Sequence, residues 1–272
     1  MKTVRPFYKL SVLSRYENKI IHGISQRGGG VSEGCYQSLN LGLHVGDETA
    51  RVIENRKRFC GELGIKLSRT VCCEQVHGTN VRIVDEKDMG RGTLTLEDII
   101  ENTDGLITNK KNIALMLFFA DCTPVFIYDP RNDAIGLSHA GWRGTLGNIA
   151  AKTLRAMHDA YGTKPSDCIA AIGPCIGGCC YEIGDEVAEK FNDIFTSMHL
   201  PSTAFSRILF RDEGKYHLSL YEANSALLVQ EGISSENISS EHCCTSCNVD
   251  EFYSYRAEKG KTGRHAAVIC LK

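Results

Sequence analysis

The sequence has no apolar run long enough to cross a membrane, and it has almost no net charge. Its longest apolar run, residues 113–120 (IALMLFFA), is far shorter than the about 20 residues that a membrane-spanning helix needs. The 31 basic and 33 acidic residues give a formal net charge of −2. A protein that binds nucleic acid through its phosphates is instead basic overall or carries a basic stripe. We therefore expect neither a membrane nor a nucleic acid as a partner.

Proline is scarce as well, and the chain lacks repeats and low-complexity segments. There are 6 prolines in 272 residues, and no stretch rich in proline, glycine and serine divides the chain. With 42% hydrophobic residues, a chain of this length can bury a large core. We expect one domain over residues 1–272.

No signal peptide is expected at the N-terminus, because charged residues are scattered through residues 1–19 and an apolar segment is missing. The default compartment is then a reducing cytoplasm, in which thiols stay free or bind metal. Cysteine is nevertheless abundant, and its odd count of 13 rules out complete disulfide pairing. We expect most of these cysteines to be small core residues.

Strand-like and helix-like patterns alternate along the chain, which predicts an α/β or α+β protein with strands buried on at least one face. The expected strands are residues 20–27, 70–75, 81–84, 113–120, 125–128, 134–138, 168–172 and 265–271. The expected helices are residues 48–63, 146–157, 184–195 and 218–231. For the first helix, Asp47 is the expected N-cap and Gly64 the expected stop.

Three segments place a metal-competent side chain at the end of a predicted strand: EQVHG, ADCTP and SHAGWRG. They carry His77, Cys122 and His139, and two imidazoles with one thiolate suit zinc with an open fourth position. The same residues are consistent with a thiol hydrolase in which Cys122 is the nucleophile and a histidine the base. A third interpretation of these residues is the ligand set of a blue-copper site. A four-copper oxidase is disfavoured, because the 9 histidines include no His-x-His pair.

Two further cysteine clusters, GPCIGGCCYE and CCTSC, lie in the second half of the chain. Cys244-x-x-Cys247 is a strong metal signal only beside a second such pair. The nearest candidate, Cys175-x-x-x-Cys179, has unsuitable spacing. We therefore expect these clusters to be free of metal rather than a zinc ribbon.

Arginine and glycine indicate where an anion would bind. The segment Gly141–Gly144 contains Arg143 and leads into a helix starting near Thr145, whose free N–H groups suit phosphate. Arg56 lies on the apolar face of the first predicted helix, so it either extends out to solvent or points into a pocket. Arg264, just before the final strand, is the second candidate for phosphate.

Taken together, these segments resemble the laccase-domain family, also described as polyphenol-oxidase or YfiH-like proteins. The stretches that carry the resemblance are SLNLGLHVGDE, Asn55-Arg56, EQVHGTNV, ADCTPV, HAGWRGT, IGPCIGGCCYEIG and YSYRAEKGKTGRHAA, in the family's order over residues 38–272. One departure is that the family often has two arginines where this chain reads Arg256-Ala257, which puts the role of the second arginine in doubt.

The resemblance implies a single mixed α/β domain with mixed β-sheets layered against helices, and a catalytic zinc whose ligands carry over to His77, Cys122 and His139. It implies a purine nucleoside phosphorylase that cleaves adenosine, inosine or S-methyl-5′-thioadenosine with phosphate, and some members also deaminate adenosine. The family pocket positions that match are Asn40, Arg56, Gln75 and Arg264.

Three other functions stay open at this point. One is a copper-dependent polyphenol oxidase. Another is a Cys–His hydrolase that edits peptidoglycan precursors, an activity to which some bacterial members of the family are linked. The third is a non-enzymatic, thiol-rich metal-binding module, which would use the cysteine clusters at residues 175–180 and 243–247 rather than Cys122.

Overall fold

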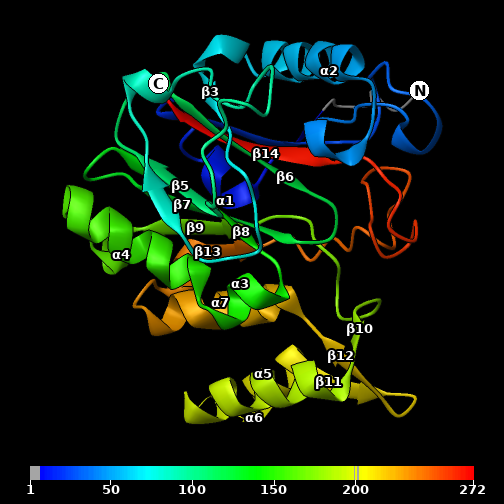
Figure 1. Cartoon of the computed structure of the whole chain (residues 1–272). Coiled ribbons are helices and arrows are strands. Elements are labelled where there is room, and N and C mark those ends of the chain that lie inside the picture. Colours follow the sequence, from blue (N-terminus) through cyan, green and yellow to red (C-terminus); the bar gives the residue numbers. More distant parts are fainter. Residues whose placement is uncertain (1–6, 199, 201) are drawn as a thin grey trace.

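Two mixed β-sheets pack against each other in the computed structural model, which describes residues 7–198, 200 and 202–272 (Figure 1). Residues 1–6, part of the segment in which no signal peptide is expected, lie outside the described residues. The first sheet has five strands in the order β1 (Phe7–Tyr8), β2 (Ile20–Ser25), β14 (His265–Leu271), β6 (Ala114–Phe119) and β3 (Thr70–Val71). The second has six, in the order β13 (Ile238–Ser240), β9 (Ile169–Ile172), β7 (Thr123–Asp129), β8 (Ala134–Ala140), β5 (Gly105–Thr108) and β4 (Val81–Ile83).

Helices cover the outer faces of both sheets, and a third small sheet lies at one end of the molecule (Figure 1). The small sheet is formed by β10 (Glu182–Ile183), β12 (Lys215–Leu218) and β11 (Leu209–Asp212). The α-helices are α1 (Ser11–Ser14), α2 (Thr49–Glu62), α3 (Trp142–Leu146), α4 (Ile149–Tyr161), α5 (Asp185–Ser197), α6 (Ser202–Ile208) and α7 (Leu220–Gln230). Short 3-10 helices are Gly34–Tyr36, Leu43–Val45, Leu67–Arg69, Glu86–Asp88, Pro165–Asp167 and Ser235–Asn237.

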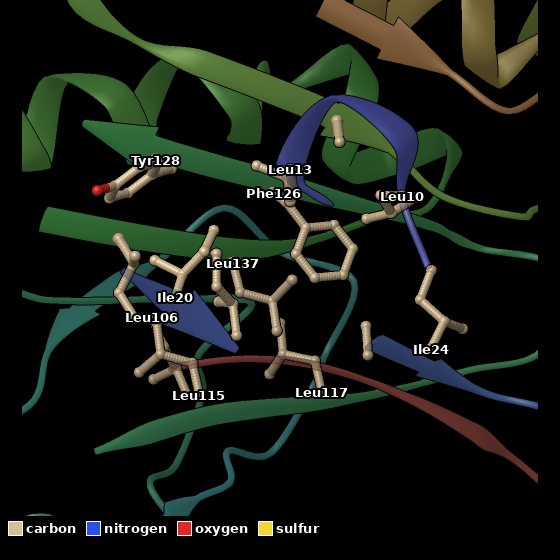
Figure 2. Close-up of a cluster of buried hydrophobic side chains, with 14 of the residues drawn as sticks. Leu10, Leu13, Ile20, Ile24, Leu106, Leu115, Leu117, Phe126, Tyr128 and Leu137 are labelled. Atoms are coloured by element: carbon tan, nitrogen blue, oxygen red, sulfur yellow. The ribbon is translucent and has the colours of Figure 1, made fainter. Parts of the chain in front are cut away.

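The strand β6 shows how the layers form, because successive side chains of a strand point to opposite faces. Leu115 and Leu117 enter the core between the two large sheets, which Leu10 and Leu13 of the α1 region help to fill (Figure 2). Met116, on the opposite face of β6, packs in the cluster beneath α2. A strand buried on both faces reads as a continuous apolar run, as residues 113–120 do.

The expected fold class, mixed α/β with mixed sheets layered against helices, is confirmed. Several element boundaries differ from the prediction, and two expected elements differ most. The expected helix 146–157 is divided into α3 and α4 at Asn148, which adopts a φ of 54° and caps α4 by accepting a hydrogen bond from the Ala151 N–H. The expected strand 70–75 ends at Val71.

Several elements were not predicted: β1, β5, β10, β11, β12, β13, α1 and α6. In addition, α2 starts at Thr49 with Glu48 at its N-cap, without a side-chain capping bond, rather than with Asp47. The Asp47 carboxylate is engaged elsewhere, by Ser32 and Asn40. In the described part of the chain, no helix combines the length and the apolar composition that crossing a bilayer requires.

Candidate metal centre

His77, Cys122 and His139 come together where the two large sheets meet. Cys122 lies in the turn that leads from β6 in one sheet to β7 in the other, and His139 is the penultimate residue of β8. His77 is presented from the loop that follows β3. One ligand atom from each of the three residues lies within 4.8 Å of the other two. The exposed His77, the half-buried Cys122 and the buried His139 thus form a site that opens to solvent on one side.

Asp104, immediately before β5, holds two of these residues in place. Its buried carboxylate lies 2.8 Å from Nδ1 of His139, which leaves Nε2 available as a ligand atom. It also accepts the backbone N–H groups of Val76 (3.3 Å), His77 (3.0 Å) and Gly78 (2.7 Å). A carboxylate behind a histidine is the usual support of a metal-bound imidazole. Sequence reasoning missed Asp104, because its place one residue before a short, unpredicted strand carries no signal.

The backbone is strained on both sides of this centre. His77 and Asp121 have φ values of 59° and 83°, in the left-handed region that costs a residue other than glycine of the order of 1 kcal/mol or more. The strain at His77 is held by its N–H bond to Asp104. Asp121 is fixed through its carboxylate, which accepts hydrogen bonds from the Thr245 hydroxyl (2.7 Å) and the Arg256 N–H (2.6 Å). Both ligand-bearing turns are therefore rigidly positioned.

The electrostatics of the centre favour an ionised thiol. Burial by itself would raise the pKa of Cys122, but the charge of His139 and hydrogen bonds from His139 and His77 lower it to about 6. Burial would likewise lower the pKa of His139, but the Cys122 thiolate and the Asp104 carboxylate raise it to about 9. Burial also opposes ionisation of Asp104, yet its hydrogen bonds, first from His139, keep its pKa below the usual range. The thiolate is the form that binds metal.

The donor set fits a single zinc ion, which combines readily with two imidazoles and a thiolate and keeps one position open. Gly141 gives a further indication, because a Cβ on it would stand 3.0 Å from Cys122 Sγ and 3.1 Å from His77 Cδ2. A multi-copper centre does not fit. Within the described ranges, this is the one cluster of potential metal ligands that contains histidine, and its three ligands suffice for one ion.

The residues expected to bind substrate are divided by the structure into two groups. Arg264 is half-buried, and burial lowers its pKa. The charge of Cys122 acts in the opposite direction and raises this pKa, so the two side chains lie near each other. Arg143 follows Gly141 by two residues and is exposed over the Trp142 ring, 4.2 Å from its centre. Arg264 therefore lies near the candidate metal centre, and Arg143 is close to it in sequence.

The other three predicted residues are occupied by structural hydrogen bonds. The Gln75 amide is paired with the backbone of Phe118 in both directions, at 2.7 and 2.8 Å. Asn40 is buried and joins Asp47, Gly42 and the Arg264 N–H. Arg56 is 1% exposed and donates to three backbone carbonyls. The polar atoms of Gln75 and Asn40 are thus engaged, and Arg56 is held through Nε and Nη1.

His44 is a candidate that sequence reasoning passed over, although it stands in the SLNLGLHVGDE stretch. Desolvation of its imidazole by the surrounding protein, followed by the charges of Arg264, Arg56, His139 and His77, lowers its pKa to about 4. This imidazole is therefore close enough to His139 and His77 for their charges to act on it. The nearby positive charges were the missing signal, and only the fold brings them together.

Layered mixed sheets, with a His77–Cys122–His139 cluster of potential metal ligands at the strand ends, define the class of this molecule as a mixed α/β protein with a candidate metal centre. The chain belongs to the family described as "Multi-copper polyphenol oxidoreductase laccase", whose family model matches residues 21–272. The family expected from the sequence motifs is thereby confirmed.

Named relatives cover nearly the same extent. The chain is 39% identical over 249 residues to "Purine nucleoside phosphorylase YlmD" of Geobacillus stearothermophilus, covering 92% of this chain and 89% of the relative. It is 37% identical over 254 residues to the protein of the same name from Bacillus subtilis, covering 93% and 89%. Among solved structures, the Bacillus licheniformis hypothetical protein YfiH aligns with a TM-score of 0.90 at 37% identity, covering 98% of this chain and 99% of that chain.

Proposed function

We propose that the chain is a zinc-dependent purine nucleoside phosphorylase that cleaves adenosine, inosine or S-methyl-5′-thioadenosine with phosphate. The observation that carries the proposal is the His77–Cys122–His139 cluster with Asp104 behind it, in a chain whose relatives bear the name purine nucleoside phosphorylase. The products would be the free base and ribose 1-phosphate, or its methylthio counterpart. The proposed compartment is the cytoplasm, where the 13 thiols would stay reduced.

The protein's own groups would perform three tasks in this reaction. His77, Cys122 and His139 would hold the metal, and Asp104 would keep the His139 ring oriented through its 2.8 Å contact. When bound, zinc would supply a Lewis acid with one open coordination position. That property suits both phosphorolysis and the attack of water on adenine, so we include adenosine deamination as a second activity of the same centre.

Arginines would hold the phosphate. Cleavage of the glycosidic bond builds positive charge on the sugar, so the attacking anion must be fixed without losing its charge. The Arg143 guanidinium makes no hydrogen bond or ion pair within the part of the chain described, and it lies over the Trp142 ring. Arg264 uses one nitrogen of its guanidinium for the Thr262 and Gly263 carbonyls. A planar guanidinium can contact two phosphate oxygens at once and stays charged.

A thiol hydrolase is the second candidate, and one observation favours it. The Cys122 thiolate, the His139 imidazolium and the Asp104 carboxylate stand in the order nucleophile, base and orienting acid. The two candidates differ in their need for metal. A hydrolase of this kind works without zinc, whereas the phosphorylase would lose activity on chelation.

The deciding experiment is incubation of the purified protein with adenosine and phosphate, followed by chromatography of the products. We expect adenine and ribose 1-phosphate, dependent on phosphate and abolished by chelation or by Cys122→Ala. Inosine would report deamination. Unchanged adenosine, inosine and S-methyl-5′-thioadenosine would overturn the proposal, and activity that survives chelation would favour the hydrolase.

A further inference from the structure

A second cluster of potential ligands lies outside the centre described above. It consists of the thiols of Cys179, Cys180, Cys244 and Cys247, whose four sulfur atoms lie within 4.8 Å of one another. Cys247 Sγ is 3.6 Å from Cys179 Sγ and 3.4 Å from Cys180 Sγ. The segments that carry these pairs are separated by more than sixty residues of sequence, so the fold rather than chain proximity creates the cluster.

These spacings match a single tetrahedral metal ion. With zinc–sulfur bonds of about 2.3 Å, the sulfurs of a four-thiolate site stand about 3.8 Å apart. An iron–sulfur cluster would divide its four cysteines among two or more iron atoms, so that cysteines on different irons would stand farther apart. Four thiols in a reduced chain, gathered around one point, are the ligand set of a closed structural zinc site.

The loops around the cluster are built to bring thiolates together. The Gly177 N–H donates to Cys244 Sγ at 3.2 Å, a contact of the kind that stabilises metal-bound sulfur. A Cβ on Gly177 would stand 3.1 Å from Cys244 Cβ and 3.2 Å from Cys179 Sγ, so the loop approaches this closely because the residue is glycine. The backbones are also joined, through Cys175 N–H to the Cys243 carbonyl and Thr245 N–H to the Cys175 carbonyl.

We propose that Cys179, Cys180, Cys244 and Cys247 bind a structural zinc ion, distinct from the ion at Cys122. The sequence-based expectation of metal-free clusters rested on the unsuitable spacing of Cys175 and Cys179 as a second pair beside Cys244 and Cys247. The structure offers Cys179 and Cys180 in that place and leaves Cys175 wholly buried, where its role is in the backbone contacts. The ion would join the loop after β9 to the loop after β13.

This second ion would also support the position of Cys122. The same two loops bind Asp121, the residue before it. The Ile176 N–H donates to the Asp121 carbonyl at 2.9 Å, and the Thr245 hydroxyl donates to its carboxylate at 2.7 Å. Closing the four thiols around a metal would therefore fix the turn that presents Cys122, without any contact with substrate.

Metal analysis of four variants tests the proposal. The native chain should carry two zinc ions, Cys122→Ala one, the double variant Cys179→Ser/Cys247→Ser one, and the combined triple variant none. Cys243→Ser is the matched control, since Cys243 lies in the same segment but outside the cluster; it should keep two. In the Cys122→Ala background, cobalt should give the intense spectrum of four thiolate ligands, and the thermal midpoint should fall when that metal is removed.

Failure would be unambiguous and separate from failure of the proposed reaction. A Cys122→Ala protein, folded and reduced, that binds no metal would overturn the second site. The same conclusion would follow from a double variant that keeps two zinc ions, or from a disulfide among these cysteines that persists in reductant. Because these tests use metal content and cobalt spectra, they do not depend on which substrate the enzyme uses.

Discussion

Arg56 and Arg264 carry the same guanidinium group in different surroundings. Arg56 donates to the carbonyls of Leu41, Gly92 and Thr93 at 2.7–2.8 Å, and it lies 4.4 Å from the centre of the Phe118 ring. It faces no carboxylate among these contacts. Arg264 stands beside the metal ligands and senses the charge of Cys122. The surroundings therefore favour Arg264 as the phosphate ligand and give Arg56 a structural role.

Replacing Arg264 should weaken phosphate use. In Arg264→Ala we expect a higher KM for phosphate and a loss of kcat/KM for phosphorolysis by about 10- to 150-fold, because one charge-assisted contact is worth about 1.5–3 kcal/mol. Zinc content should stay normal. Steady-state kinetics at varied phosphate provide the measurement. Adenosine deamination, which uses water, should lose less activity.

Arg56→Ala is the control for this prediction. It should lower the free energy of unfolding by about 3 kcal/mol, since it leaves three buried carbonyls without a donor. Any folded fraction should keep its KM for phosphate. An Arg56→Ala protein of normal stability with a raised KM for phosphate would contradict the assignment of the two arginines.

The turn between β8 and α3 shows how an element can shape the metal centre without supplying a ligand. Gly141 is the N-cap of α3, with a φ of −70° that any residue adopts. Its role is steric, because a Cβ would press against both Cys122 and His77 at 3.0–3.1 Å. The turn therefore needs a residue without a side chain at this point.

We expect Gly141→Ala to lower zinc affinity by about tenfold, the lower end of the effect of disturbing the support of metal ligands. Competition titration with a chromophoric chelator provides the measurement. Gly184→Ala is the matched control: Gly184 is the N-cap of α5 with a φ of −78°, and nothing lies within 4 Å of its Cβ position. Equal zinc affinity in both variants would argue against the steric role.

Many of the strands and helices could be predicted from the hydrophobic pattern of the sequence and from the order of its motifs. The runs at residues 113–120 and 265–271 became β6 and β14, since both faces of each strand are buried and the sequence signal is strong. The three candidate ligands His77, Cys122 and His139 were expected from predicted strand ends and from the family resemblance, and the fold brings them together. Asp104 and the pairing of Cys179 with Cys247 were not expected, because they depend on contacts across the fold that no local pattern records.

At the scale of the whole molecule, two buried histidines make the free energy of unfolding depend on pH. His265 is fully buried between Phe119 and Phe252, and neither ring nitrogen has a hydrogen-bond partner among the described residues. Burial, with the charge of Arg264, lowers its pKa to about 3, and burial lowers that of His22 to about 4. Unfolding exposes both side chains and returns their pKa values to about 6.5.

Below pH 6.5 the unfolded chain therefore binds more protons than the folded chain. The free energy of unfolding has its full value above that pH and falls as the pH drops. The decline continues to about pH 4 for His22 and about pH 3 for His265. Each histidine contributes a slope of about 1.4 kcal/mol per pH unit. At pH 5, each histidine should therefore have lowered the free energy of unfolding by about 2 kcal/mol.

Denaturant unfolding of His265→Phe at pH 5 and pH 7 measures this contribution. The variant should lose about 2 kcal/mol less between the two pH values than its parent. Both proteins should carry Cys122→Ala, so that release of metal from the triad does not enter the comparison. Parallel loss of stability in variant and parent would show that His265 is not the titrating group.

The central place of β14 has a consequence for the order in which the molecule is made. This strand, His265–Leu271, lies between β2 and β6 and pairs antiparallel with both. A ribosome releases β2 and β6 well before β14, so the nascent chain carries two strands whose facing edges have no partner. Unpaired edges attract other chains. The sheet therefore closes only after residue 271 has left the exit tunnel, and chaperone protection of the nascent chain would matter most until then.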